Sequence, residues 1–420
     1  MPGSHNDERS DMTTAVVAIF VLVYLGMILG GLPFLQLDRT GVALLGAIAV
    51  VGLGALDTEH AAAAIHTPTV LLLFAFMVVS AQLRLGGFYG WVTRRIASLP
   101  VSPPTLLAAL IAVVAALSAI FSNDVVCLAA APVLADACMK RRLNPIPYLI
   151  ALACAANVGS AATLIGNPQN MLIGAKLQLD FGRYTILALP VVLPSLALTW
   201  AIIAWCSRGR WHAPALSSTS MPERRDDDEP LDIWQSLKGL SVAAVLLVVF
   251  LATALPREVA ALAGAAILLT SRKLHSRKML GLVDWELLVL FIGLFIVNRA
   301  FEDTGIVAAA VADLRHAGIA LDHPTALFGA GFVLSNIVSN VPAVMLLLPL
   351  ATHELAGPML ALVTTLAGNL LIVGSIANII VVDAASRQGI HIDWKMHARI
   401  GIPVTLATLL VAALWLMLSM

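Results

Sequence analysis

Two short stretches decide the fold: Ser122-Asn123-Asp124 and, 217 residues later, Ser339-Asn340-Val341. Each lies between long apolar runs, and each is followed by a proline, Pro132 or Pro349, at the matching distance. A polar Ser-Asn pair costs free energy in hydrocarbon unless hydrogen bonds satisfy it or it lines a cavity. Because the same pair recurs at matching places in two halves, the pattern predicts a transporter with an internal repeat and a binding site at mid-membrane depth.

The composition is that of a membrane protein. Of the 420 residues, 60% are hydrophobic and only 12% are charged, whereas soluble domains carry about 25% charged residues. The formal net charge is zero, which argues against a nucleic-acid partner. The four cysteines are isolated in apolar runs, and no GxxxxGK[ST] motif is present. We therefore expect no metal, no cofactor and no enzymatic activity.

The chain divides into two similar halves, 13–206 and 236–420, after a polar tail at 1–12 and around a hydrophilic stretch at 207–235. Segments 103–140 and 325–352 are apolar but are broken near their centres by the Ser-Asn motifs. We interpret these two segments as re-entrant hairpins. Apolar runs long enough to cross a bilayer lie at 13–33, 41–56, 68–85, 145–175 and 184–206 in the first half, and at 236–255, 258–271, 284–301, 359–386 and 400–419 in the second.

The two halves align with one another at a nearly constant offset. A shift of 217 or 218 residues places Arg39 on Arg257 and Ser122 on Ser339, which indicates internal duplication. Five crossings per half is an odd number, so the second half is expected to be inverted relative to the first. The predicted fold is an all-α polytopic membrane protein: an inverted repeat of two five-helix halves, each with a re-entrant hairpin and a broken transmembrane helix.

The distribution of basic residues predicts the orientation of this fold. With the topology above, 19 of the 25 Lys and Arg residues fall on the side that holds the loop 207–235. Cytoplasmic loops carry the excess of Lys and Arg. We therefore expect a multi-pass protein of a bacterial-type inner membrane, with the loop 207–235 in the cytoplasm and both termini outside.

Asp124 is the residue that says most about mechanism. A carboxylate at membrane depth is costly, and it indicates a functional site by default. Burial raises its pKa and a nearby cation or helix N-terminus lowers it, so the group can carry a proton in one state and release it in another. Its repeat partner is Val341, which favours a single proton or cation per cycle. The alternative is an acid that only caps the second hairpin helix.

A second polar constellation interrupts a membrane-length run at Gly166-Asn167-Pro168, with Thr163 before it and Asn170 after it. Proline lacks a donor and glycine permits unusual backbone angles, so the helix is expected to break here. The freed backbone groups then need partners, which an ion, a substrate or polar neighbours can supply.

The matching stretch of the second half contains Asn369, Ser375 and Asn378 but no proline, so a softer break is expected there. For both stretches the alternative is a kinked helix that packs through small residues. The hairpin tips and the breaks together give the candidate substrate- or ion-binding set: Ser122, Asn123, Thr163, Gly166, Asn167, Asn170, Ser339, Asn340, Asn369, Ser375 and Asn378.

These residues resemble those of the ion transporter superfamily, which includes arsenite permeases, citrate-type and dicarboxylate carriers, and sodium/proton antiporters. The likeness extends over about residues 40–419 and rests on the two Ser-Asn motifs and on Gly166-Asn167-Pro168. In the sodium-coupled dicarboxylate branch the tips read Ser-Asn-Thr, whereas Asp124 and Val341 stand at those positions here. The chain looks closer to the arsenite-permease-like branch, in which a proton is the usual coupling ion.

The resemblance implies a secondary active transporter that moves a small anion or a metalloid oxyanion such as arsenite, coupled to protons through Asp124. By analogy with the dicarboxylate branch we expect a homodimer; the other partners are the small inorganic or organic anion and the lipid bilayer. Three alternatives stay open: a sodium/proton antiporter with sodium as coupling ion, a dicarboxylate or citrate-type carrier, and, in a different class, a channel with the same repeat.

Overall fold

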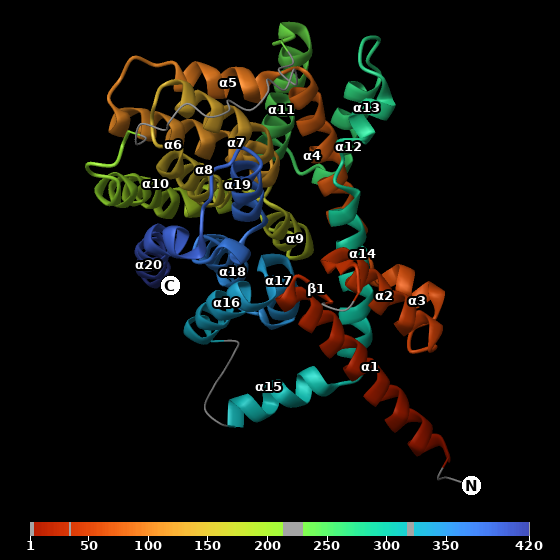
Figure 1. The fold of residues 1–420 in the computed structure, drawn as a ribbon. Helices are drawn as coiled ribbons and strands as arrows, with labels where there is room; N and C mark the ends of the chain where they lie inside the picture. The colour runs from red at the N-terminus through yellow and green to blue at the C-terminus, as the bar shows by residue number, and fades with distance from the viewer. Residues whose placement is uncertain (1–3, 33–34, 213–229, 317–322, 420) are drawn as a thin grey trace. The chain divides into compact units, whose positions relative to one another are not determined.

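The described chain is almost entirely helical and forms two compact units (Figure 1). The computed structural model describes residues 4–32, 35–212, 230–316 and 323–419, so most of the predicted linker 207–235 lies outside the described residues. The first unit comprises Met1–Leu71 and Asp284–Leu360, and the second comprises Leu72–Val283 and Ala361–Met420. Each compact unit thus combines segments from both halves of the sequence.

The first unit is built around the packing of α2 on α14. Small residues bring these helices close together: a Cβ on Gly293 of α14 would lie 2.8 Å from the backbone of Ala43. Helix α1 begins at Ser4, inside the predicted polar tail 1–12. The helices of this unit are α1 (Ser4–Leu29), α2 (Arg39–Gly52), α3 (Thr58–Ala64), α14 (Trp285–Asp303), α15 (Ile306–His316), α16 (Pro324–Val338), α17 (Asn340–Leu347) and η1 (Leu348–Leu350), with a ribbon of β1 (Gly31–Leu32) and β2 (Leu37–Asp38).

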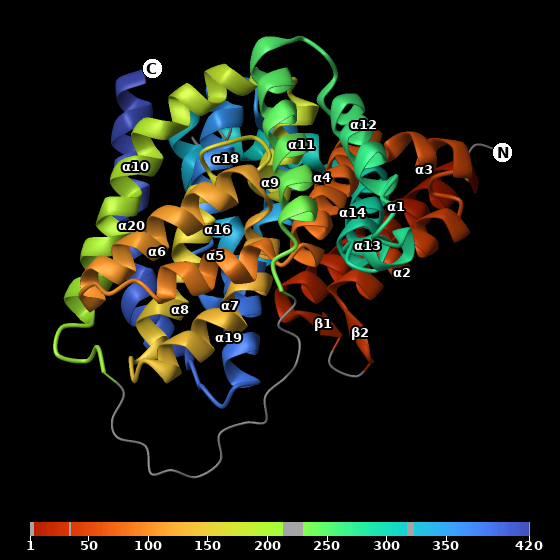
Figure 2. The same cartoon turned by 90° about the horizontal axis from the view of Figure 1, so that it is seen from above.

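The second unit is built around α8, which packs against α6, α7, α10 and α19. Figure 2 shows these helices side by side. Two helices, α4 (Thr67–Leu85) and α18 (Ala356–Ala367), begin in the first unit and continue into the second. The other helices are α5 (Phe88–Ala97), α6 (Pro103–Ile120), α7 (Asn123–Lys140), α8 (Pro145–Ser160), α9 (Pro168–Lys176), α10 (Phe181–Cys206), α11 (Ile233–Ala252), α12 (Arg257–Leu269), α13 (Ser276–Leu280), η2 (Ile372–Gly374), α19 (Ile376–Ser386) and α20 (Trp394–Ser419).

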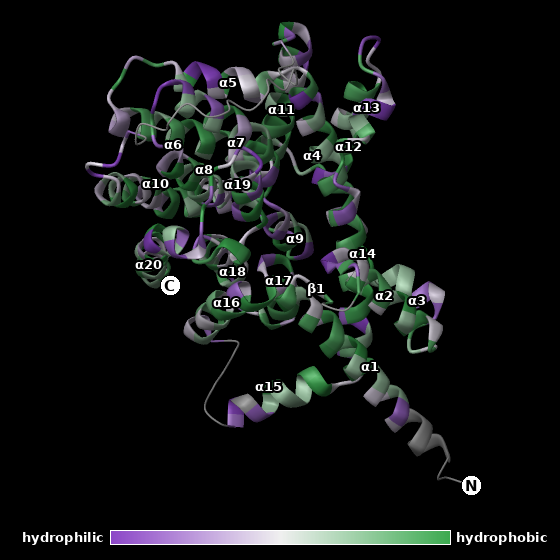
Figure 3. Cartoon of the chain, viewed as in Figure 1, coloured by the Kyte–Doolittle hydropathy of each residue, from purple (hydrophilic) through white to green (hydrophobic). Residues whose placement is uncertain are grey.

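Hydrophobic residues dominate the helices along their length (Figure 3). Among the described residues, six segments are long and apolar enough to cross a membrane: Ser10–Leu29, Thr67–Leu85, Pro103–Ile120, Phe181–Cys206, Ile233–Ala252 and Trp394–Ser419. Many Leu, Val and Ile side chains on these helices are exposed, as expected where the surrounding medium is lipid. The segment Pro103–Ile120 has 18 residues and a length of about 27 Å, close to the roughly 30 Å thickness of the hydrocarbon core of a bilayer.

Helices α6 and α7 both run between the start of α8 and the break that follows it. At the start of α8, the Tyr148 hydroxyl donates to the Pro103 carbonyl at the beginning of α6, at 3.2 Å. At the break, the backbone amide of Asn123, the first residue of α7, donates to the Gly166 carbonyl at 3.0 Å. The Thr163 hydroxyl in the same break donates to the carbonyl of Ala119, near the end of α6. Helix α6 therefore runs toward the break and α7 runs back from it.

Contacts between loops of the second unit join segments that the predicted topology places on the same side of the membrane. The Asn144 amide, between α7 and α8, donates to the Trp211 carbonyl after α10 at 2.8 Å. On the side predicted to face outward, Arg257 donates from Nη2 to the carbonyls of Gly174 and Leu179 at 2.9 and 2.8 Å.

Candidate functional site: two broken helices of the second unit

Both predicted helix breaks are present in the second unit. Helix α8 ends at Ser160 and α9 begins at Pro168. Helix α18 ends at Ala367 and α19 begins at Ile376, with the short turn η2 between them. The second interruption is as complete as the first, so the expectation of a softer break without proline is wrong.

Side-chain amides explain why the second break needs no proline. The Asn378 Nδ2 donates to the carbonyls of Gly368 and Leu371 at 2.8 and 3.0 Å. In the first break, Asn170 Nδ2 donates in the same way to the carbonyls of Ser160 and Thr163, at 3.4 and 3.0 Å. Backbone carbonyls released by a broken helix must be satisfied inside a membrane. In both breaks the asparagine that opens the following helix satisfies them.

Asn157, one turn before the end of α8, is the centre of a network of amides. It is 1% exposed. Its Oδ1 accepts from Asn123 Nδ2 at 3.0 Å and from the Ser375 hydroxyl at 2.9 Å. Its Nδ2 donates to the Oδ1 atoms of Asn369 and Asn378 at 2.9 and 3.1 Å. One side chain therefore joins the start of α7 to the second break.

Thr365 of α18 makes the reciprocal connection to the first break. Its hydroxyl accepts from Asn167 Nδ2 at 3.2 Å and from Gln169 Nε2 at 3.3 Å. The same hydroxyl donates to Asn170 Oδ1 at 3.3 Å. Asn157 and Thr365 are 208 residues apart, as are Asn170 and Asn378. Helix α8 thus carries Asn157, which completes the break after α18. Helix α18 carries Thr365, which completes the break after α8.

Gly166 is required by the close packing of the first break. A Cβ on this residue would lie 2.3 Å from the Ser160 carbonyl oxygen and 2.8 Å from that of Ser118. The neighbouring Asn167 is the N-cap of α9: its side chain accepts from the Asn170 amide at 2.9 Å and donates to the Ser160 hydroxyl at 2.9 Å. The Asn167 cap, the first break and Thr365 therefore form one hydrogen-bonded unit.

Asp124 occupies the first turn of α7, beside this network. The N-cap of the helix is Ser122, which makes no capping side-chain bond. An acid in the first turn interacts favourably with the helix N-terminus. Asp124 is half-buried within the protein. It follows Asn123 directly, so it lies next to the residue that connects α7 to Asn157.

The second Ser-Asn tip belongs to the first unit and is built differently. Ser339 joins α16 to α17 with φ of 77° and ψ of 161°, a region of backbone space occupied almost only by glycine. Asn340 is buried, and its Oδ1 accepts from the Ser335 hydroxyl. The network around Asn157 and Thr365 consists only of residues of the second unit.

The polar side chains of the second-unit site are neutral. No Lys, Arg, Asp or Glu is among the buried side chains in the described part of the chain. The buried His397 of α20 lies with Nε2 3.1 Å from the Asn369 carbonyl. No cluster of His, Cys, Asp and Glu suited to a metal is found among the described residues. The site can therefore bind through amides, hydroxyls and backbone groups.

Sequence reasoning missed Asn157 and Thr365 because each is a single polar residue inside an apolar run. The internal repeat of the sequence could have indicated both residues. The two breaks are offset by 208 residues, and the same offset places Asn157 on Thr365. Two polar residues at matching positions before two breaks would have added both to the predicted site.

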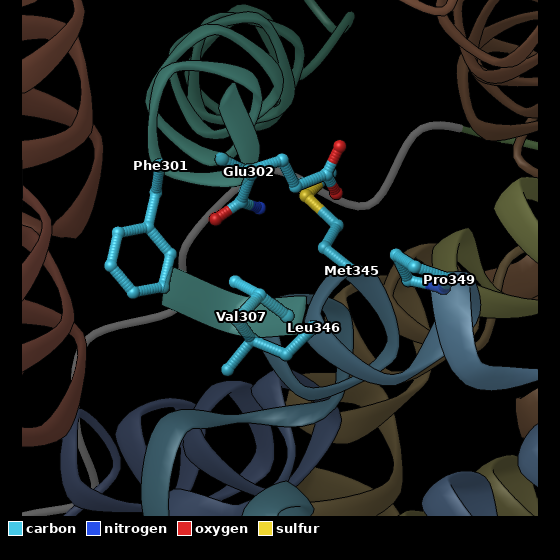
Figure 4. Close-up of a pocket in the computed structure, with 7 residues that line it drawn as sticks. Phe301, Glu302, Val307, Met345, Leu346 and Pro349 are labelled. Atoms are coloured by element: carbon cyan, nitrogen blue, oxygen red, sulfur yellow. The ribbon is translucent and has the colours of Figure 1, made fainter. Parts of the chain in front are cut away.

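The first unit contains a separate pocket, shown in Figure 4. No predicted site residue lines it. Its one buried amide, Asn298, accepts from the Tyr24 hydroxyl at 2.9 Å. The lining residues are Asn298, Phe301, Glu302, Val307, Met345, Leu346 and Pro349.

Comparison with known proteins identifies the family. The sequence model described as "Citrate transporter" (CitMHS) matches residues 20–367. The chain belongs to the CitMHS family. It is therefore a multi-pass membrane transporter and not an enzyme, and the resemblance to the ion transporter superfamily is confirmed.

Relatives of this CitMHS protein cover nearly its whole length. An uncharacterized transporter of Mycobacterium bovis is 30% identical over 442 residues, which span 97% of this chain and 98% of the relative. The silicon efflux transporter LSI3 of rice (Oryza sativa subsp. japonica) is 27% identical over 443 residues, or 89% and 91% of the two chains. The inner membrane protein YbiR of Escherichia coli is 28% identical over 338 residues, or 80% and 84%.

A solved structure supports the fold. The YdaH transporter of Alcanivorax borkumensis superposes with a TM-score of 0.55 at 14% sequence identity, covering 96% of this chain and 97% of that one. This likeness supports an all-helical multi-pass transporter fold, as the sequence predicted.

Proposed function

We propose that this protein is a secondary active transporter of the inner membrane that moves a small anion or metalloid oxyanion, with arsenite as prototype, coupled to protons through Asp124. The observation that carries the proposal is the neutral, buried amide network centred on Asn157, which bonds directly to Asn123 at the start of α7. A solute site and a titratable carboxylate are thereby adjacent in sequence and in structure.

The neutral lining favours a weakly charged solute over a polyanion. Burying a charge without a partner costs far more than burying a hydrogen-bonded hydroxyl. Citrate would bring several carboxylates to a site whose buried described side chains include no Lys or Arg. Metalloid oxyacids are small and are largely protonated near neutral pH. The names of two relatives agree with this class: the rice silicon efflux transporter and the putative transporter arsB of Dictyostelium discoideum.

The same proposal includes the inverted repeat with two re-entrant hairpins. It is supported by the course of α6 and α7, which run to the first break and back, and by the reciprocal bonds of Asn157 and Thr365. Inverted-repeat transporters place their sites where discontinuous helices meet near the bilayer midplane. In this arrangement the loop 207–235 is cytoplasmic, both termini are outside, and the protomers form a homodimer.

Proton flux in proteoliposomes tests the proposed function. Purified protein is reconstituted with a pH-sensitive dye inside, and arsenite, antimonite, sulfate, citrate, succinate and sodium are offered in turn. We expect a saturable proton signal with arsenite or antimonite that disappears when the proton gradient is collapsed. A signal with sodium alone would instead indicate sodium/proton exchange. Unsaturable solute flux without any gradient would indicate a channel, and either result would overturn the proposal.

Asp124→Asn tests the coupling residue. We expect proton-coupled transport to fall at least about 100-fold, since an amide cannot exchange a proton. Asp136→Asn is the matched control, because Asp136 is on the same helix but pairs with Lys140 at the exposed end. We expect that variant to retain transport within twofold. An unchanged proton signal in Asp124→Asn would place the coupling group elsewhere.

A further inference from the structure

Two buried polar atoms at the centre of the network have no hydrogen-bond partner. They are Oδ1 of Asn123 and Nδ2 of Asn369. Their residues are 4% and 0% exposed. A buried donor or acceptor without a partner costs about 1–3 kcal/mol, so two such atoms beside one side chain indicate a missing partner.

Both atoms flank the same carboxamide, that of Asn157. Asn123 bonds to its oxygen and Asn369 bonds to its nitrogen. The first unpartnered atom is an acceptor and the second is a donor. A single group that bonds to both atoms must therefore donate one hydrogen bond and accept another.

The orientation of the three amides is fixed by Asn378. Its Nδ2 donates to two carbonyls of the break, so its Oδ1 must face Asn157. That contact requires the Asn157 nitrogen on this side and its oxygen on the side of Asn123. Exchanging oxygen and nitrogen in any one amide would set two donors or two acceptors against each other.

The reciprocal cluster around Thr365 lacks this feature. No side-chain atom of Asn167, Asn170 or Thr365 is unpartnered. A threonine hydroxyl offers one donor and two acceptor positions, and all three are used. Of these two clusters, only the one around Asn157 has unpartnered atoms, and they belong to the two amides Asn123 and Asn369.

We propose that Asn123, Asn157 and Asn369 form a subsite for one hydroxyl group of the transported solute. This rests on the proposed function as a transporter of small oxyacids. The hydroxyl donates to Asn123 Oδ1 and accepts from Asn369 Nδ2. A carboxylate cannot do so because it only accepts, and a sodium ion cannot because it accepts nothing. The subsite therefore selects the protonated form of an oxyacid over a hydroxyl-free dicarboxylate such as succinate or a cation.

The test is ligand-induced thermal stabilisation of the purified full-length protein. Arsenite and boric acid supply hydroxyl groups, and succinate and sodium chloride serve as the acceptor-only and cationic probes. We expect arsenite or boric acid to raise the melting midpoint of the wild type, and the affinity to fall about tenfold or more in Asn123→Ala and Asn369→Ala. Because this readout does not depend on transport, it distinguishes a failed subsite from a failed transport function.

Ser195→Ala and Thr405→Val are the matched controls. Each removes a buried hydroxyl of the second unit that has no partner and that lies on another helix, α10 or α20. Both should keep the wild-type response. An unchanged affinity in the Asn123 and Asn369 variants would mean that only water occupies the position, and would overturn the proposal. If those variants fail to fold, stabilisation of the wild type by succinate but not by the oxyacids would overturn it equally.

Discussion

In both broken helices of the second unit an asparagine amide bonds the freed carbonyls, but a different side chain completes each break. The first break opens into α9 with Pro168 and is completed by a threonine hydroxyl, that of Thr365. The second opens into α19 with Ile376 and is completed by an amide, that of Asn157. The comparison teaches that hydrogen bonds to freed carbonyls maintain a break whether or not proline is present. Two amides bonded to Asn157 each keep an unpartnered atom, whereas no side-chain atom of Asn167, Asn170 or Thr365 is unpartnered.

The largest effect is expected from Gly166→Ala. The new methyl group would lie 2.3 Å from the Ser160 carbonyl oxygen, so the first break cannot close around Asn170. We expect loss of folded protein, measured as the monodisperse fraction in size-exclusion chromatography. Gly52→Ala at the end of α2 is the control, since its Cβ would meet nothing within 4 Å. Full recovery of folded Gly166→Ala protein would contradict the described geometry of the break.

Replacing Asn157 and Thr365, the central residues of the two clusters, compares the breaks directly. Asn157→Ala deletes four hydrogen bonds and Thr365→Val deletes three. Hydrogen bonds inside membrane proteins contribute about 0.6 kcal/mol on average and up to about 1.7. We expect losses of about 2–4 and about 1–3 kcal/mol in the free energy of unfolding, measured by denaturant titration. Equal stability of Asn157→Ala and wild type would mean that the network contributes nothing to the fold.

The smallest effect is expected from Ile376→Pro, which gives the second break the proline of the first. Position 376 is the first residue of α19, where proline is well tolerated. The preceding Ser375 is extended, with φ of −144° and ψ of 139°, as proline requires. We expect a gain of up to about 1 kcal/mol, measured by the same titration. A clear destabilisation would show that the two breaks differ in backbone geometry at this point.

Much of the fold follows from the sequence because hydrophobic length and helix-breaking residues act locally. The Ser-Asn motifs correctly predicted where α6 gives way to α7 and α16 to α17, and Gly166-Asn167-Pro168 correctly predicted the first break. Sequence similarity then confirmed a membrane transporter. The candidate residues Asn123, Ser375 and Asn378 are brought together as a site requires.

What the sequence did not reveal depends on contacts between distant segments. Asn157 bonds to residues up to 221 positions away, so nothing near it in the sequence indicates its role. The completeness of the second break was missed for the same reason, because Asn378 and not proline maintains it. The partial exposure of Asp124 also depends on tertiary packing, which hydropathy alone does not describe.

Anomalous scattering from arsenic gives the most direct test of the central claim, that the second-unit network holds the solute between Asn123 of α7 and Asn369 of the second break. The wild-type protein is crystallised with arsenite, and an anomalous difference map is calculated from data collected at the arsenic absorption edge. The account predicts one strong peak in the second unit beside these two amides, lost in Asn369→Ala. A strong peak elsewhere, such as beside Glu302 in the first unit, with none at these amides would contradict it.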